Sequence, residues 1–262
     1  TEDRLKNISF SESYTTAKQV IIYNNGEKAE KMSLADKIYQ TFIEKNRWQY
    51  IPKGLANTLL ITVFSGLIGI LIGSSIANVR VAYERNDEKS VWIRILNAIF
   101  KVYITVFRGT PMVVQLLIMY YVVFAQTAVN PLIAAVIAFG LNSGAYLSEA
   151  IRSGIMAIEI GQFEAGRSMG FNYHETVRYI IMPQAIKVSL PAIFNEYIAL
   201  LKESSIVGYI GLMDLTKAGD IIRSNTYEAL VPLVSVALVY LVLVMIMTSF
   251  VSRLERRLKR EK

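Results

Sequence analysis

Three long stretches of this chain contain no charged residue, and this distribution constrains the fold more than any other feature. The stretches are residues 54–79, 109–148 and 229–252, which contain 26, 40 and 24 residues. A helix needs about 20 mainly apolar residues to cross a bilayer core of about 30 Å. The stretches therefore predict one, two and one membrane spans, and they exclude a soluble cytosolic protein.

The boundaries of the spans follow from local signals. The first span is predicted over about residues 55–79. The second stretch divides at Asn130 and Pro131, because proline favours the first turn of a helix and asparagine favours the position before it. A fifth, less apolar span is predicted over about residues 188–207, and the last over residues 229–252. The predicted fold class is an all-α membrane protein with about five transmembrane helices.

Basic residues in short loops indicate which side of the membrane is cytoplasmic. In the connections after the first and third spans these residues are Arg80, Arg85, Lys89, Arg94, Lys101, Arg152, Arg167, Arg178 and Lys187, and six more lie in the C-terminal tail. The opposite connections contain only Lys217 and Arg223. The N-terminus is therefore predicted outside and the C-terminus in the cytoplasm. This bias also accounts for the net charge of +7 without a nucleic-acid partner.

The segment before the first span divides into two parts. Residues 1–32 are polar, apart from a strand-like stretch at residues 19–23. Residues 33–50 are predicted to form an amphipathic helix at the membrane interface that ends near Asn46 and is followed by Trp48. A surface helix of a soluble lobe is the alternative for this segment.

Several kinds of site are excluded by composition. The chain has no cysteine and one histidine, which rules out disulfides, thiolate metal sites, a thiol nucleophile and paired imidazoles. No phosphate-binding loop of the Gly-x-x-x-x-Gly-Lys-Ser/Thr type occurs. We therefore predict no catalytic residue, no metal site and no cofactor bound by this chain. Any uphill movement of a substrate must draw on an ion gradient or a partner protein.

Residues 160–183 form the most informative polar stretch. Asn172 and Glu175 have the spacing of a capping box, Gly170 suits a hinge, and Pro183 suits a helix boundary. The pattern predicts two short helices joined at Gly170. We expect this loop to present Phe163, Ala165, Gly166 and Met169 outward to another protein, the alternative being a solvated connector.

The same stretch resembles a known signature. Glu164-Ala165-Gly166, three residues, Gly170, nine residues and Ile180-x-Met182-Pro183 are similar to the EAA motif of ABC-importer permease subunits, with Gly166 and Met182 as departures. Further stretches resemble the polar amino-acid permeases: Arg108-Gly109-Thr110-Pro111, Val114-Gln115-Leu116, Asn142-Ser143-Gly144-Ala145-Tyr146, Pro183-Gln184-Ala185, Leu190-Pro191 and Lys202-Glu203-Ser204-Ser205. The resemblance covers about residue 48 to the C-terminus.

The resemblance implies a multi-pass protein of the bacterial plasma membrane, with a transmembrane domain over residues 51–262. Its implied partners are ABC ATPase subunits that bind ATP and Mg, a second identical or related permease subunit, an external solute-binding protein and an amino acid. Residues 1–32 resemble a fragment of a solute-binding protein. The residues implied to contact the ATPase are Phe163, Glu164, Ala165, Gly166, Met169, Gly170 and Pro183. A secondary transporter driven by an ion gradient, or an anchor or sensor without transport, remains an alternative.

An amino-acid substrate would explain the polar residues in the spans. Charged side chains near the bilayer centre cost about 2.5–3.5 kcal/mol each on insertion scales, so Glu196 in the fifth span needs a reason. A zwitterion needs acceptors for its ammonium group and donors for its carboxylate. The predicted pathway residues are Thr110, Gln115, Asn142, Ser143, Tyr146, Asn195, Glu196 and Lys202. Lys202 and Glu203 could instead end the helix at the outer surface, the role of Arg108 stays open, and Pro111 is expected to break its helix. Glu149 and Arg152 are expected to form a structural ion pair.

Overall fold

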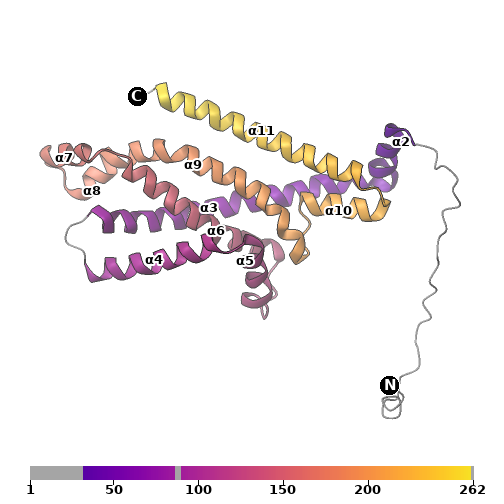
Figure 1. Cartoon of the computed structure of the whole chain (residues 1–262), viewed down its shortest axis with the longest axis horizontal. Coiled ribbons are helices and arrows are strands. Elements are labelled where there is room, and N and C mark those ends of the chain that lie inside the picture. Colours follow the sequence, from indigo (N-terminus) through magenta and orange to yellow (C-terminus); the bar gives the residue numbers. More distant parts are fainter. Residues whose placement is uncertain (1–31, 86–89, 261–262) are drawn as a thin grey trace, which may run out of the picture. The chain divides into compact units, whose positions relative to one another are not determined.

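The computed structural model describes residues 32–85 and 90–260, and these residues form helices and connecting turns without a strand (Figure 1). The strand predicted at residues 19–23, and all but the last residue of the predicted solute-binding-protein remnant at 1–32, lie outside the described residues. Residues 35–262 form one compact unit, to which the description below applies.

A short helical segment precedes the first long helix. It comprises α2 (Leu34–Ile38), the π-helical turn η1 (Tyr39–Ile43) and the 3-10 turn η2 (Glu44–Gln49). Lys45 and Asn46 have φ values of 57° and 54°, in the left-handed region, which ends the segment where the sequence predicted. Its position at a membrane interface stays a prediction.

Helix α3 (Tyr50–Arg85) has 36 residues and extends beyond the predicted span at both ends. It packs against α6 (Pro131–Met156) through small residues. A Cβ atom added to Gly73 would lie 2.9 Å from the Cβ of Leu147, and one added to Gly69 would lie 2.7 Å from the Ser143 hydroxyl oxygen. Glycine at both positions therefore allows the two helices to approach closely, as small residues do in membrane helix pairs.

The span predicted at the start of the 109–148 stretch is not a continuous helix. α4 (Val91–Gly109) is followed by α5 (Met112–Ile118) and η3 (Met119–Val123), and the chain bends by 109° between α4 and α5–η3. The break falls at Pro111, as predicted, because proline has no amide hydrogen for the helical ladder. Arg94 and Lys101, assigned to a loop above, instead lie on α4.

The boundary predicted at Asn130 and Pro131 is confirmed. Pro131 is the first residue of α6, and the Asn130 side chain accepts a hydrogen bond of 2.9 Å from the amide of Leu132. This is the geometry of a helix N-cap, which satisfies an amide that has no partner in the first turn.

After α6 the chain contains the loop predicted over residues 160–183, named the coupling loop here for the role that its resemblance implies, and three further helices. The loop consists of α7 (Ile160–Ser168), α8 (Tyr173–Thr176) and the π-helical turn η4 (Val177–Ile181). It leads into α9 (Met182–Glu203) and the 3-10 turn η5 (Ser204–Ile210). α10 (Leu215–Thr226), which the sequence did not predict, and α11 (Leu230–Arg260) complete the chain.

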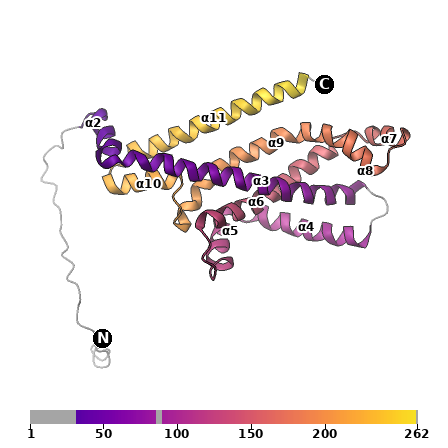
Figure 2. The same ribbon diagram turned by 180° about the vertical axis from the view of Figure 1, so that it is seen from behind.

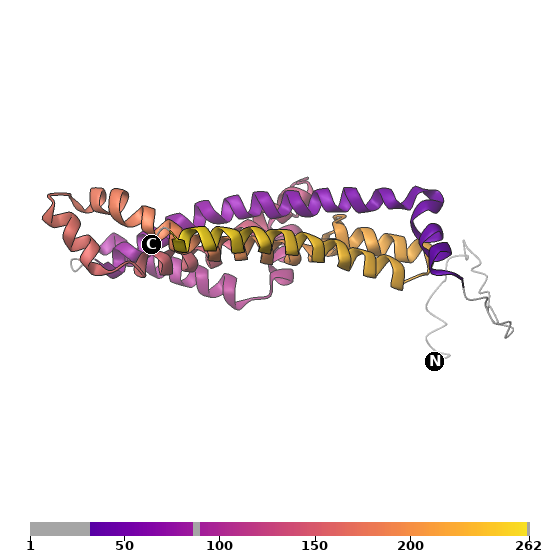
Figure 3. The same cartoon turned by 90° about the horizontal axis from the view of Figure 1, so that it is seen from above.

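α3, α6 and α9 pack against one another and form the centre of the unit. α7 and α8 lie at one end of this bundle and α10 at the other (Figures 1, 2 and 3). Fully buried apolar side chains from α3, α5 and α6, among them Ile61, Leu116 and Phe139, fill the core between the helices.

Among the described residues, three helices are long and apolar enough to cross a membrane, within residues 34–85, 131–156 and 230–258, and a fourth crossing results if the bent pair counts as one. α9, predicted as the poorer fifth span, is helical over 22 residues but is not among these. The chain is thus an all-helical membrane protein, while five crossings and their orientation remain predictions.

Candidate functional site

The break between α4 and α5 leaves a backbone carbonyl without its helical donor. In an uninterrupted helix the Phe107 carbonyl would accept from residue 111, but Pro111 has no amide hydrogen. The Gln115 side-chain amide donates to the Phe107 oxygen at 2.8 Å, and that of Asn142 donates to it at 3.1 Å. Side chains from α5 and α6 therefore replace the missing backbone bond.

The same side chains also bind each other. Gln115 Nε2 lies 2.7 Å from Thr110 Oγ1, and Asn142 Nδ2 lies 2.9 Å from Gln115 Oε1. The structure thus brings together three residues predicted for the pathway, Thr110, Gln115 and Asn142. The side-chain amides of Gln115 and Asn142 already donate to the Phe107 carbonyl of the broken helix. Their first role is therefore to hold the bend between α4 and α5, which we call the elbow, against α6.

A second group of predicted residues surrounds Glu196 on α9. Glu196 approaches the Ser143 hydroxyl on α6, whose oxygen is buried and has no well-formed hydrogen bond among the described residues, and it interacts electrostatically with Arg108. The Arg108 guanidinium carbon lies 5.1 Å from the ring centroid of Tyr146, within the range of a cation–π contact. We call Arg108, Ser143, Tyr146 and Glu196 the polar cluster.

The polar cluster contains both the acceptor and the donors that a zwitterion requires. Glu196 supplies a carboxylate, while Arg108 and Ser143 supply donors, and the three residues come from α9, α4 and α6. Sequence reasoning assigned no role to Arg108; its position directly before the helix break at Thr110 and Pro111 is the signal that places it at this junction.

The remaining two predicted pathway residues lie elsewhere. Asn195 and Lys202 are both exposed on α9. Lys202 interacts electrostatically with Glu203, the last residue of α9. This placement agrees with the alternative that Lys202 and Glu203 end the helix.

The coupling loop has the internal geometry that its sequence predicted. The Asn172 amide donates to the Glu175 carboxylate at 2.8 Å, and the Glu175 amide donates to the Asn172 side chain at 2.9 Å, which is a reciprocal capping box. Gly170 has a φ of 87°, in the left-handed region that glycine adopts without a steric penalty. α7 and α8 are thus two short helices joined by a tight turn.

The prediction that the loop presents Phe163 and Gly166 outward is wrong. Phe163 is 8% exposed and packs with Val81 of α3 and Ile181 of η4. Gly166 is buried against α8, where an added Cβ would lie 2.6 Å from the Thr176 methyl carbon. This contact explains why glycine stands where the EAA motif has alanine.

The other residues implied to contact the ATPase remain accessible. They are Glu164, Ala165, Met169, Gly170 and Pro183, all of them exposed. Met169 is 71% exposed, an unusual position for a large apolar side chain on a polar loop. These residues form an exposed surface on the loop that follows α6 and precedes α9 in the chain. The surface combines small, apolar and acidic side chains.

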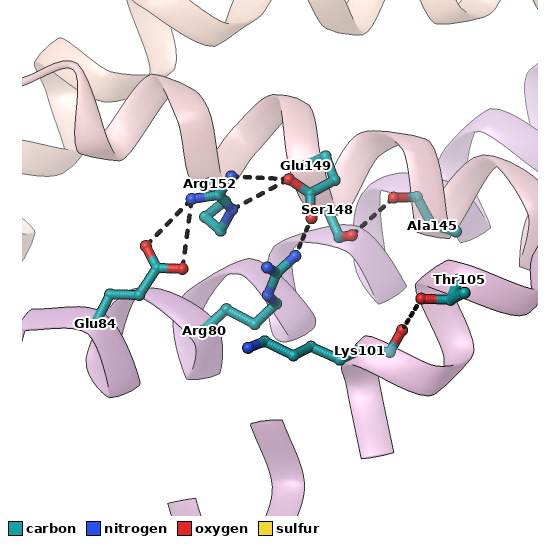
Figure 4. Close-up of polar contacts among 8 residues, drawn as sticks. All are labelled: Arg80, Glu84, Lys101, Thr105, Ala145, Ser148, Glu149 and Arg152. Atoms are coloured by element: carbon teal, nitrogen blue, oxygen red, sulfur yellow. Dashed lines mark hydrogen bonds and ion pairs between the residues drawn. The ribbon is translucent and has the colours of Figure 1, made fainter. Parts of the chain in front are cut away.

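An ion network joins α3 to α6 near the coupling loop (Figure 4). The predicted pair is present, because Glu149 accepts from Arg152 at 2.9 Å. Arg80 of α3 also binds Glu149, and Arg152 lies 3.1 Å from Glu84 of α3. Sequence spacing along α6 identified the Glu149–Arg152 pair, but nothing in the sequence indicated the partners on α3.

Within residues 32–85 and 90–260, no group of three or more histidine, cysteine, aspartate or glutamate side chains lies close enough together to hold a metal ion.

Comparison with known proteins identifies the family. Residues 65–260 match the model of the binding-protein-dependent transport system inner membrane component. The chain is 41% identical over 212 residues to the arginine transport system permease protein ArtQ of Bacillus subtilis strain 168, covering 80% of this chain and 93% of ArtQ. It is 35% identical over 218 residues to the glutamine transport system permease protein GlnP of Escherichia coli K12, covering 81% of this chain and 95% of GlnP.

A solved structure shows the same architecture. The crystal structure of an amino acid ABC transporter with histidines matches with a TM-score of 0.72 and 39% identity, covering 82% of this chain and 98% of that chain. The resemblance that rests on the EAA-like loop is therefore confirmed. The chain belongs to the family of inner membrane components of binding-protein-dependent transport systems.

Proposed function

We propose that this chain is the permease subunit of an ATP-driven importer of polar amino acids. Family membership over residues 65–260 and the substrates named for ArtQ and GlnP support this function. Because the chain has no phosphate-binding loop, ATP and Mg are bound by separate ATPase subunits. A second permease subunit and an external solute-binding protein complete the transporter.

The observation that carries the proposal is the geometry of the coupling loop. α7 and α8 form a capped, hinged pair placed between α6 and α9, with Glu164, Ala165 and Met169 exposed. A solvated connector would need neither the reciprocal cap nor an exposed methionine. The loop fits a surface on which an ATPase subunit docks, so that movement of the ATPase is transmitted to the two helices that the loop connects.

The polar cluster is the proposed substrate contact. Glu196 would accept the ammonium group, and Arg108 and Ser143 would donate to the carboxylate. Thr110, Gln115 and Asn142 fix the elbow that holds Arg108 in place. The cluster lies where α4, α6 and α9 meet, so relative movement of these helices would expose it to one side of the membrane and then to the other.

We propose that the chain crosses the membrane five times, with its N-terminus outside and its C-terminus in the cytoplasm. The distribution of basic residues supports this orientation. α9 counts as a crossing because it packs against α3, α6 and α11, which shield part of its polar surface from lipid. The coupling loop and the C-terminal tail then share the cytoplasmic side.

The test combines Glu164→Lys with Gly170→Pro. Glu164 is exposed, and proline cannot adopt the positive φ of Gly170, so the variant alters both the surface and the hinge of the loop. We expect loss of the ATPase subunits on co-purification and loss of ATP-dependent uptake of arginine and glutamine. The control is Glu159→Lys, since Glu159 is exposed and makes no side-chain capping bond. Normal co-purification and uptake in the double variant would refute the docking role.

A further inference from the structure

The last residue of α3 contacts the coupling loop at several points. Arg85 Nη2 donates to the Ile158 carbonyl oxygen at 3.2 Å, in the turn between α6 and α7. Its guanidinium carbon lies 4.4 Å from the ring centroid of Phe163 on α7. Partial burial raises the pKa of the Tyr173 hydroxyl at the start of α8, and the nearby Arg85 charge opposes this rise. The Arg85 side chain thus contacts the turn before α7 and α7 itself, and its charge acts on the start of α8.

The surroundings of Arg85 are largely apolar. One turn earlier on α3, Val81 packs in a buried cluster with Ile155, Phe163 and Ile181. Arg85 Nε is buried and has no hydrogen-bond partner among the described residues. An arginine suits this position better than a lysine, because its planar group can stack on a ring while an edge donates to a carbonyl. The contact of Arg85 with the loop therefore depends on the planar shape and the donors of the guanidinium group, and not only on its positive charge.

The coupling loop follows α6 and precedes α9 in the chain, so α3 is not its neighbour along the backbone. Arg80 and Glu84 bind α6 through the ion network, so the end of α3 already moves with α6. Arg85 adds a direct polar link from α3 to the loop itself. The end of α3, the end of α6 and the loop are held together as one block.

We propose that Arg85 is a positioning residue that couples movement of the loop to α3. In its absence the loop would still bind the ATPase but would shift relative to α3, so that ATP hydrolysis would move the helices less effectively. This inference rests on the proposed function, since it assumes that the loop receives movement from an ATPase.

The first test measures coupling in the complete transporter, with its ATPase subunits and binding protein, in liposomes. Arg85→Met keeps most of the side-chain length but removes the charge and the donors, and Phe163→Leu removes the ring but keeps an apolar side chain. For both variants we expect amino acid taken up per ATP hydrolysed to fall about fivefold or more, the lower end of typical coupling effects, with arginine and glutamine as probes. ATPase subunits should still co-purify.

Two comparison variants separate positioning from general stability. Arg85→Lys keeps a cation over the ring and should recover part of the lost coupling. Arg253→Met changes an exposed arginine on α11 and should leave uptake per ATP unchanged. A merely structural role would reduce the amount of complex while leaving this ratio intact, and an unchanged ratio in Arg85→Met would overturn the proposal.

A second measurement does not depend on the stability of the Arg85 variants. Because the chain has no cysteine, spin labels can be placed through Ser75→Cys on α3 and Ser168→Cys on α7, both exposed sites. We expect the same narrow distance distribution with and without ATP, and a broader one when Arg85→Met is added. A change in distance on ATP binding in the otherwise unaltered protein would show that α3 and the loop move separately, and would overturn the inference. If the unaltered transporter shows no ATP-dependent uptake, the proposed function itself fails. A change in the label distance on ATP binding overturns only the inference about Arg85.

Discussion

The Gln115 side-chain amide lies 2.8 Å from the carbonyl oxygen of Phe107 and replaces the backbone donor that Pro111 cannot supply. Gln115 and Pro111 belong to stretches that the sequence singled out, but Phe107 does not, and the hydrogen bond between Gln115 and Phe107 is known only from the structure. This hydrogen bond stabilises the 109° bend between α4 and α5–η3, and the bend in turn determines the position of Arg108.

The elbow predicts the effect of Gln115→Leu. The variant removes one of the two donors to the Phe107 carbonyl and the Gln115 acceptor of the buried Asn142 amide, and a buried polar group that loses a partner costs about 1–3 kcal/mol. We expect a lower thermal midpoint for the purified complex and reduced uptake. The exposed Gln126 provides the control Gln126→Leu, which should change neither quantity. Equal midpoints for the two variants would contradict the role of Gln115.

The contact between α3 and α6 predicts that Gly73→Ala is destabilising. The added methyl group would lie 2.9 Å from both the Leu147 Cβ and the Ser148 amide nitrogen, so the helices must separate. Overpacking of this kind typically costs about 1–3 kcal/mol. Thermal unfolding in detergent measures the effect. Gly161→Ala is the matched control, because an added Cβ meets nothing within 4 Å there, and a similar loss in both variants would argue against close packing.

The ion network predicts that Glu149→Gln destabilises the packing of α3 on α6 near the coupling loop. The change leaves the buried Arg80 without its anionic partner, and breaking a buried ion pair costs about 3 kcal/mol. Asp220→Asn serves for comparison, since the Asp220 carboxylate binds Lys217 and Arg223 near the surface and such pairs contribute less than about 1 kcal/mol. Denaturation of both variants should show the larger loss for Glu149→Gln; the reverse order would contradict the network.

The polar cluster predicts that Glu196→Gln impairs uptake without disturbing assembly. Loss of a charge-assisted contact of about 1.5–3 kcal/mol corresponds to roughly a 10- to 100-fold loss of affinity. Competition uptake with a panel of amino acids would measure it and would also reveal the preferred substrate. Glu203→Gln changes an exposed carboxylate at the end of α9 that acts on Glu196 only through its charge, and it should have a smaller effect. Comparable losses would move the substrate contact toward the end of α9.

Local signals in the sequence predicted the features that depend on local interactions. The Asn130 cap, the break at Pro111 and the capping box of Asn172 and Glu175 each involve atoms within a few residues, and all three are present. Charge-free stretches likewise identified the apolar parts of α3, α6 and α11, the three helices long and apolar enough to cross a membrane among the described residues.

Features that depend on distant partners were missed. Phe163 was expected to face outward because its own helix is polar, but Val81 and Arg85 of α3 cover it. α4 was assigned to a loop because Arg94 and Lys101 interrupt its apolar pattern, and it counts toward a membrane crossing only when it is taken together with α5–η3 across the bend. The burial of Phe163 could not follow from periodicity, since its partners on α3 lie about 80 residues away in the chain.

The most direct test of the central claim is uptake by liposomes that contain this permease, its ATPase subunits and its binding protein, with ATP inside or outside and with all ion gradients dissipated by ionophores. The account predicts that arginine or glutamine accumulates only when the ATPase has ATP, and that ionophores leave the rate unchanged. Uptake that continues without the ATPase subunits and stops on addition of an ionophore would contradict it, and would assign the carboxylates of α9 to an ion-driven transporter.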